Sequence, residues 1–356
     1  MTISIEKTAI LEKQDKQPLI IAGPCSVESP EQVMETALEL KKYNIDVLRG
    51  GIWKPRTRPN AFEGVGGRGI GWLKKAGEAA GVPVGTEVAV PMHVEICLSH
   101  EIDVLWIGAR TTGNPFSVQA IADALKGTDV PVMVKNPVSP DIGLWIGALE
   151  RLYKAGVTRL AAIHRGFSTS DNGRYRNEPN WHIPIELKRR IPEIPIICDP
   201  SHICGNRELL QGIAQESIDL MFQGIMLEVH PNPDSALSDS EQQLTPDDFG
   251  KLINSLELKK VKIQDPDVYK KISVIRENID KIDSNLIHLL GERMQLAEKI
   301  GKYKKDQKVT VFQPSRWNEI LNSRVSEAEK YDLSAEFITK IYQYIHEEAV
   351  RHQEEI

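Results

Sequence analysis

Residues 103–110 read "DVLWIGAR", a nearly continuous apolar run that ends in a charged side chain. Continuous rather than alternating apolar runs are typical of parallel strands that are buried on both faces. Seven other runs share this character: "PLIIAG" (18–23), "DVLRGG" (46–51), "VPVGTE" (82–87), "VPVMVKN" (130–136), "RLAAIHRG" (159–166), "IPIICDPSH" (194–202) and "GIMLEVHP" (224–231). Segments with helical periodicity separate the runs. Eight such units in roughly 250 residues predict an α/β fold, a TIM (β/α)8 barrel, rather than a doubly wound open sheet.

The pattern changes near residue 263, because strand-like runs stop and glycine almost disappears. Apolar residues then recur at spacings of three and four from Ile275 to Ile300, which predicts one amphipathic helix of roughly 35 residues. Two further helices are expected at about 314–330 and 334–355. A helix this long needs a partner along its whole length. We therefore expect a barrel domain at 1–262 and an all-α three-helix domain at 263–356 that dimerises.

The composition excludes several classes of partner. The 356 residues carry a net charge of -6, which gives no electrostatic reason to expect a nucleic acid or an anionic membrane. The N-terminal residues lack an apolar segment of signal-peptide length, and no later run is long enough to span a bilayer. A cytoplasmic, reducing location is expected. The four cysteines are too few and too irregularly spaced for a disulfide framework.

The ends of the predicted strands are unusually polar, and the carboxyl ends of TIM-barrel strands are where active sites form. The polar residues at these ends are Cys25, Arg49, Lys54, Glu87, Arg110, Lys135, His164, Arg165, Asp199, His202, Glu228 and His230. Five basic side chains directed at one opening repel one another unless an anion is bound. The pattern therefore predicts a multiply anionic substrate, with phosphate as the first candidate.

Cys25 is open to several interpretations: a buried core residue, a nucleophile or a metal ligand. It would meet His202, Glu228 and an acidic fourth group near the barrel axis. Thiolate, imidazole and carboxylates together can bind Mn²⁺, Fe²⁺, Co²⁺ or Zn²⁺ without strong selectivity. A metal site is one hypothesis that this spacing allows.

Two motifs suggest a dinucleotide site and a hydrolytic triad, but their sequence context favours neither. "GVGGRG" at 64–69 matches a dinucleotide-binding pattern, but no apolar strand precedes it, so we interpret it as a flexible loop. Asp199, Ser201 and His202 resemble a hydrolytic triad in composition. Residues so close in sequence rarely adopt the relay geometry, and a metal site fits them better.

Five stretches together resemble 3-deoxy-D-arabino-heptulosonate 7-phosphate (DAHP) synthase, in the short bacterial form related to the octulosonate synthases. They are "AGPCSVES" (22–29), "VLRGGIWKPRTRPNAFEGVG" (47–66), "IGAR" (107–110), "DPSH" (199–202) and "LEVHPNPDSALSD" (227–239). The resemblance covers about residues 18–260 and implies a TIM barrel. It also implies condensation of phosphoenolpyruvate with erythrose 4-phosphate, the first step of the shikimate pathway. Arg58, and "VKNPVSP" from Val134, depart from the family pattern, so arabinose 5-phosphate remains the alternative sugar.

The resemblance also implies roles for particular residues. The implied ligands of a divalent metal, Mn²⁺ before Fe²⁺, Co²⁺ or Zn²⁺, are Cys25, His202, Glu228 and Asp239. The implied phosphoenolpyruvate contacts are Arg49, Lys54, Arg110, Lys135 and Arg165, with Lys54 also catalytic. Arg56 and Thr57 are implied to bind the phosphate of the aldose.

The helical tail resembles the AroQ-type chorismate mutases, intertwined all-helical dimers that need no cofactor. The matching stretches are "IRENIDKIDSNLIHLLGERMQLAEKIGKYK" (275–304) and "EEAVRHQ" (347–353). The implied catalytic residues are Arg276, Arg293, Lys304, Arg316 and Gln353, with Arg276 and Arg293 from different chains of the dimer. Departures from the family occur at Gln313, Trp317 and Ala349. Alternatively, the tail is mainly a regulatory module that binds chorismate or prephenate and inhibits the barrel.

Overall fold

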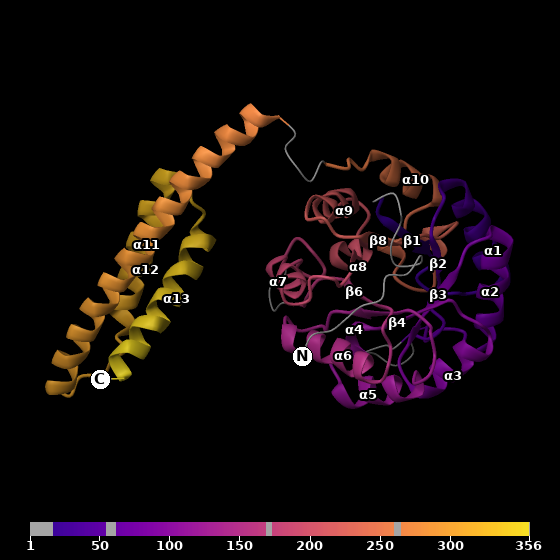
Figure 1. The fold of residues 1–356 in the computed structure, drawn as a ribbon, viewed down its shortest axis with the longest axis horizontal. Helices are drawn as coiled ribbons and strands as arrows, with labels where there is room; N and C mark the ends of the chain where they lie inside the picture. The colour runs from indigo at the N-terminus through magenta and orange to yellow at the C-terminus, as the bar shows by residue number, and fades with distance from the viewer. Residues whose placement is uncertain (1–16, 55–61, 169–172, 260–264, 356) are drawn as a thin grey trace. The chain divides into compact units, whose positions relative to one another are not determined.

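The computed structural model describes residues 17–54, 62–168, 173–259 and 265–355. The chain divides into two compact units, Met1–Lys259 and Lys260–Ile356, and each is described by itself. Figure 1 labels the helices of the two units and most of the strands.

The first unit is a closed barrel of eight parallel strands in the order β1 to β8, each paired with its neighbours in sequence and β8 paired with β1. This confirms the predicted fold. The strands are β1 (Leu19–Gly23), β2 (Val47–Arg49), β3 (Val84–Val88), β4 (Val104–Ile107), β5 (Val132–Lys135), β6 (Leu160–His164), β7 (Ile196–Cys198) and β8 (Gly224–Glu228). Each strand is shorter than its predicted run. Arg49, Lys135 and Glu228 are the last residues of β2, β5 and β8, whereas Arg110, Arg165 and the polar end of the β7 run lie in the loop or helix that follows the strand.

Helices surround the barrel (Figure 1). They are α1 (Pro30–Leu40), α2 (Arg68–Ala80), α3 (Pro91–Ser99), α4 (Ala109–Thr112), α5 (Pro115–Ala124), α6 (Ile142–Lys154), α7 (His182–Arg190), α8 (Pro200–Cys204), α9 (Leu210–Asp219) and α10 (Pro246–Ser255). Side-chain caps start several of them: Ser29 accepts from the N–H of Gln32, and Asp141 accepts from that of Leu144. Arg68 and Gly69 belong to α2, so the flexible-loop interpretation of "GVGGRG" was wrong for its last two residues.

Side chains alternate between two apolar layers along each strand, as the pleat of a strand requires. The barrel interior is filled by ten residues: Leu19, Ile21, Val47, Val104, Trp106, Met133, Ala161, Ile163, Ile197 and Met226. The intervening residues pack outward against the helices. Continuing the inward series by two residues beyond Val47, Met133, Ile163, Ile197 and Met226 leads to Arg49, Lys135, Arg165, Asp199 and Glu228. The alternation that fills the core therefore also directs charged side chains into the carboxyl end of the barrel.

The second unit contains three long helices, as predicted: α11 (Pro266–Asp306), α12 (Pro314–Ala328) and α13 (Ala335–Glu354). Helix α11 has 41 residues, longer than expected, and begins where Asp265 accepts from the N–H groups of Asp267 and Val268. Helix α13 packs against both α11 and α12. The buried core of this unit is small, with Met294 and Ala297 meeting Ala349. Among the described residues, none of the helices is both long and apolar enough to cross a bilayer.

Candidate active sites

Three of the four predicted metal ligands lie together at the end of the barrel. Ligand atoms of Cys25, Glu228 and Asp239 are all within 4.8 Å of one another. The Cys25 thiol donates to Oδ2 of Asp239 at 3.2 Å. The fourth predicted ligand, His202, lies beside this cluster, with its Nε2 3.8 Å from Oε1 of Glu228.

The orientation of His202 is set by Asp199, a buried residue that follows β7. The carboxylate of Asp199 lies 2.9 Å from Nδ1 of His202 and 2.9 Å from Nζ of Lys135. Because a carboxylate accepts, Nδ1 carries the proton, and the lone pair of Nε2 faces the cluster. The hydroxyl of Ser201 instead accepts from the backbone N–H of Glu228. This serine therefore has no place in a hydrolytic relay with Asp199 and His202.

The charges around Cys25 suit a cation. Burial, and after it the nearby Glu228, raise the pKa of the Cys25 thiol to about 12 against the opposing effect of Lys54. Burial also disfavours ionised Asp239, yet His202 and Lys54 hold its pKa well below the usual range. A soft thiol sulfur beside carboxylates and an available imidazole nitrogen is a donor set that first-row divalent metals accept. The residues present therefore fit the metal that the resemblance implies.

Two predicted cations contact this cluster. Nζ of Lys54 lies 2.8 Å from the sulfur of Cys25. Arg49 is 2% exposed, and its Nη2 lies 3.1 Å from Oε1 of Glu228. Its guanidinium also lies over the ring of Trp106, 5.3 Å from the centroid. The Nε and Nη1 groups of Arg49 are buried and have no hydrogen-bond partner among the described residues, so an anion could accept from them.

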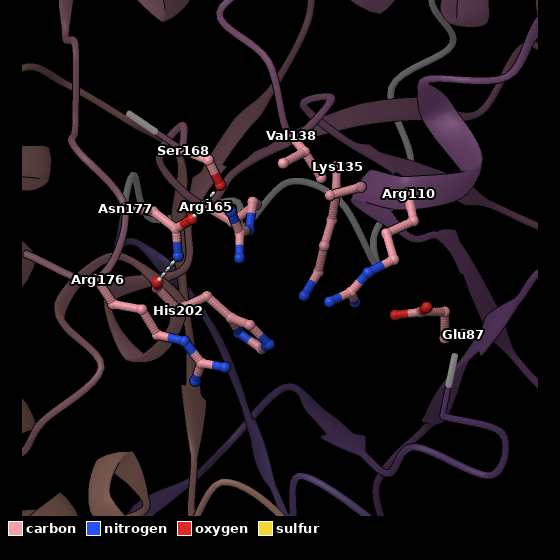
Figure 2. Close-up of a pocket in the computed structure, with 10 residues that line it drawn as sticks. Glu87, Arg110, Lys135, Val138, Arg165, Ser168, Arg176, Asn177 and His202 are labelled. Atoms are coloured by element: carbon pink, nitrogen blue, oxygen red, sulfur yellow. Dashed lines mark hydrogen bonds between the residues drawn. The ribbon is translucent and has the colours of Figure 1, made fainter. Parts of the chain in front are cut away.

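A cavity of about 400 Å³ opens beside His202. Figure 2 shows the nitrogen-bearing ends of Arg110, Lys135 and Arg165 directed into it, with Glu87 at one side. Arg176 and His202 line the same cavity. Burial, together with the positive charges of Arg176 and Arg110, lowers the pKa of Arg165 to about 10, although Asp199 opposes this shift. Burial and mutual repulsion destabilise the charged forms of these basic side chains, so an anionic ligand bound among them would stabilise the site.

Sequence reasoning missed Arg176, which lies in the connection between β6 and α7. Its Nη1 contacts Oδ1 of Asp239 at 3.2 Å and Oε1 of Gln242 at 2.8 Å. Nothing in the spacing of the strands marks this arginine, because it lies far from the end of any strand. The predicted phosphate-binding residues Arg56 and Thr57, like Arg58, are outside the described residues.

In the helical unit, two predicted mutase residues act electrostatically on His346. Burial is the largest effect that lowers the pKa of its imidazole, and the positive charges of Arg293 and Lys304 lower it as well. The ring of His346 stacks on that of Trp317, with centroids 4.4 Å apart. The amide of Gln353 donates to the carbonyl of Ala349 at 3.1 Å, and its buried Oε1 has no partner in the part of the chain that the structure describes.

The other two predicted mutase residues, Arg276 and Arg316, are exposed on the helices. Arg316 is exposed and pairs with Glu319 at 2.7 Å. Arg276 is exposed and precedes Arg293 on α11 by 17 residues, which corresponds to about 25 Å along a helix. The two arginines of one chain therefore cannot reach one small ligand together.

Comparisons with known proteins assign a family to each of the two units. Residues 1–264 match the DAHP synthetase I family, and residues 275–354 match chorismate mutase type II. A phospho-2-dehydro-3-deoxyheptonate aldolase of Thermotoga maritima is 35% identical over 241 residues, which cover 67% of this chain and 68% of that protein. A 2-dehydro-3-deoxyphosphooctonate aldolase of Legionella pneumophila (strain Lens) is 28% identical over 282 residues, covering 73% of this chain and 95% of that protein.

Solved structures give the same result. The crystal structure of the DAHP synthase of Thermotoga maritima superposes with a TM-score of 0.61 and 33% identity, over 66% of this chain and 67% of that one. Both resemblances predicted from the sequence are confirmed. The chain belongs to the DAHP synthetase I family and carries a chorismate mutase type II domain after the barrel, which makes it a bifunctional enzyme of the shikimate pathway.

Proposed function

We propose that the barrel condenses phosphoenolpyruvate with erythrose 4-phosphate to DAHP and phosphate at a divalent metal site. The supporting observation is the juxtaposition of the Cys25, Glu228 and Asp239 cluster with a cavity lined by several cations. When bound, the metal supplies Lewis acidity that polarises the aldehyde of the sugar. Cys25, His202, Glu228 and Asp239 would hold it, with Mn²⁺ as the first candidate and Fe²⁺, Co²⁺ or Zn²⁺ as alternatives.

The cations of the barrel have a separate task in this proposal. Arg49, Lys54, Arg110, Lys135 and Arg165 bind the carboxylate and phosphate of phosphoenolpyruvate. Two anionic reactants repel each other, so fixed guanidinium and ammonium groups lower the barrier by neutralising charge and by holding the reacting carbons close. Arg49 contributes N–H groups that are buried and unpaired in the described residues. Arg56 and Thr57 bind the phosphate of the aldose.

The barrel could use either of two sugar phosphates, erythrose 4-phosphate or arabinose 5-phosphate, because the relatives include a 2-dehydro-3-deoxyphosphooctonate aldolase. The "KPRT" stretch favours erythrose 4-phosphate over arabinose 5-phosphate. The test measures phosphate release from phosphoenolpyruvate with each sugar at equal concentration. Preference for the four-carbon sugar supports the proposal, whereas a higher kcat/KM with arabinose 5-phosphate would replace it.

The helical domain rearranges chorismate to prephenate without a cofactor. Two observations support a site for a dicarboxylate ether: Arg293 and Lys304 both act electrostatically on His346, and the buried Oε1 of Gln353 has no hydrogen-bond partner among the described residues. Such a site acts by holding a compact conformer and by donating to the ether oxygen, where charge develops. Loss of chorismate absorbance with the purified full chain tests this reaction; a chain that shows none would reduce the domain to a binding module.

The mutase site needs a second chain in this proposal. Arg276 lies about 25 Å from Arg293 along the helix, so it completes the site of the partner. Apolar side chains of α11 support an extensive interface, since Ile275, Ile282 and Leu289 are each more than half exposed. The domain therefore forms a homodimer.

We further propose that the helical domain transmits feedback inhibition by prephenate or chorismate to the barrel. A fused downstream enzyme already binds both compounds, so it can report their concentration. The test compares the effect of prephenate on synthase rates of the full chain and of a chain ended near Ile263. Equal inhibition of both would remove the helical domain from the regulation.

A further inference from the structure

Two consecutive glutamines, Gln242 and Gln243, are buried behind the thiol–carboxylate cluster, at 1% and 0% exposure. They follow the turn that carries Asp239, whose backbone is left-handed at φ 48°. Gln243 accepts from the backbone N–H of Cys25 at 3.0 Å and donates to the carbonyl of Ser238 at 2.8 Å. It thereby joins the backbones that carry two of the clustered side chains.

Gln242 contacts the third member of the cluster directly. Its Nε2 donates to Oε2 of Glu228 at 2.5 Å, a bond buried from solvent. Its Oε1 accepts from Nη1 of Arg176 at 2.8 Å. A guanidinium can only donate, so Arg176 fixes which end of the amide is oxygen and turns the NH₂ group toward Glu228.

Two consequences follow for the carboxylates. Oε2 of Glu228 is occupied by Gln242, so Oε1 is the oxygen on the side of Arg49 and His202, at 3.1 and 3.8 Å from their nearest nitrogens. Arg176 also donates to Oδ1 of Asp239, so that Oδ2 is the oxygen that faces the Cys25 thiol and accepts from it. One arginine–glutamine pair therefore sets the rotation of both carboxylates.

We propose that Gln242, anchored by Arg176, is a positioning residue for the metal site: it orients the Glu228 carboxylate so that Oε1 is presented to the ion. This inference rests on the proposed metal site. Hydrogen bonds behind the ligands of a metal fix their geometry, and their loss weakens metal affinity by about 10–100-fold. The Gln242 amide donates a hydrogen bond to the Glu228 carboxylate and places no second negative charge beside it.

The experiment titrates metal-free full chain with Co²⁺, which reports thiolate ligation through a charge-transfer band and ligand geometry through its d–d bands. Gln242→Leu removes both hydrogen bonds. Gln242→Glu keeps an acceptor for Arg176 but removes the donor to Glu228. The control is Gln119→Glu, since Gln119 has the same pattern on the outer helices: it accepts from Arg151 at 3.0 Å and donates to Asp123 at 3.1 Å.

Both Gln242 variants should bind Co²⁺ about 10–100-fold more weakly than the wild type and shift the d–d bands, whereas Gln119→Glu should match the wild type. If Gln242→Leu does not fold, as judged by circular dichroism, Gln242→Glu gives the answer. Wild-type affinity and spectra in the variants would overturn the role of Gln242 while leaving the metal site intact. A wild type that binds no Co²⁺ would overturn the metal site and this inference together.

Discussion

Lys54 contacts Cys25 twice: its Nζ lies 2.8 Å from the sulfur and 2.9 Å from the carbonyl oxygen of the same residue. The lysine follows β2 and the cysteine follows β1, so the contact joins two neighbouring loops at the barrel opening. Burial opposes the positive charge of Lys54, but Cys25 and Glu228 outweigh it and raise the pKa of the ammonium group. A charged lysine therefore stands beside the thiol of the cluster.

Replacing Lys54 by Met should lower synthase kcat/KM by about 100-fold or more, because a positioned charge at a developing anion is typically worth this much. Lys74→Met is the matched control, since Lys74 pairs with Asp103 at 3.4 Å on the outer side of the barrel. Steady-state rates with phosphoenolpyruvate and erythrose 4-phosphate check the prediction. A Lys54→Met enzyme with wild-type kcat/KM would exclude any role for this ammonium in the reaction.

Metal removal should separate the two activities. The thiol–carboxylate cluster belongs to the barrel, and the proposed mutase reaction needs no cofactor. Dialysis against a chelator is expected to abolish DAHP formation and to leave the rearrangement of chorismate unchanged, and Mn²⁺ should restore the first. Both activities are measured on one sample. Retention of DAHP formation after complete chelation would contradict the metal site.

The response of stability to pH should depend on His164. This side chain is buried among Trp145, Phe167, Trp181 and Phe222, and burial lowers its pKa to about 3. In the unfolded chain its pKa is about 6.5, so below that pH the unfolded state binds the additional proton. Stability from neutral His164 is therefore fully present above pH 6.5 and falls as the pH decreases toward 3.

Between pH 7.5 and 5.5 this histidine should cost about 1.4 kcal/mol of unfolding free energy. The His164→Phe variant, whose ring suits the aromatic surroundings, lacks this titration. Its unfolding free energy should therefore fall by about 1.4 kcal/mol less than that of the wild type between the same two pH values. Urea denaturation of both proteins at the two pH values gives the difference directly. Identical pH responses would mean that His164 does not remain neutral in the folded barrel.

The sequence predicted the barrel because continuous apolar runs and strand-end charges repeat eight times. It placed Arg49, Lys135 and Glu228 correctly at strand ends, since inward alternation continues past the core. It could not predict Arg176 or Gln242, which come from long connections where no periodicity fixes direction. Only the tertiary fold brings the β6–α7 connection against the residues that follow β8, through the contact of Arg176 with Gln242.

The mutase prediction turns on a distance within one helix. Arg276 and Arg293 lie about 25 Å apart along α11, so one chain cannot place both on a single chorismate. Arg276→Ala and Arg293→Ala should each lower mutase kcat/KM by about 100-fold or more. If each site takes one arginine from each chain, a heterodimer of the two variants contains one site with both arginines intact and one site with neither.

Coexpression of the two variants in equal amounts therefore regenerates intact sites. Half of the dimers should be heterodimers, and half of their sites should be complete, so about a quarter of the wild-type mutase activity is expected. Arg324→Ala coexpressed with Arg293→Ala is the control for mixing, because Arg324 is an exposed residue that pairs with Glu327 on α12. Heterodimers of Arg276→Ala with Arg293→Ala, purified by two different tags, should reach about half of the wild-type rate of chorismate consumption, because one of their two sites is complete. Heterodimers of Arg276→Ala with Arg293→Ala that stay as inactive as the parent variants would show that the two arginines do not serve one shared site.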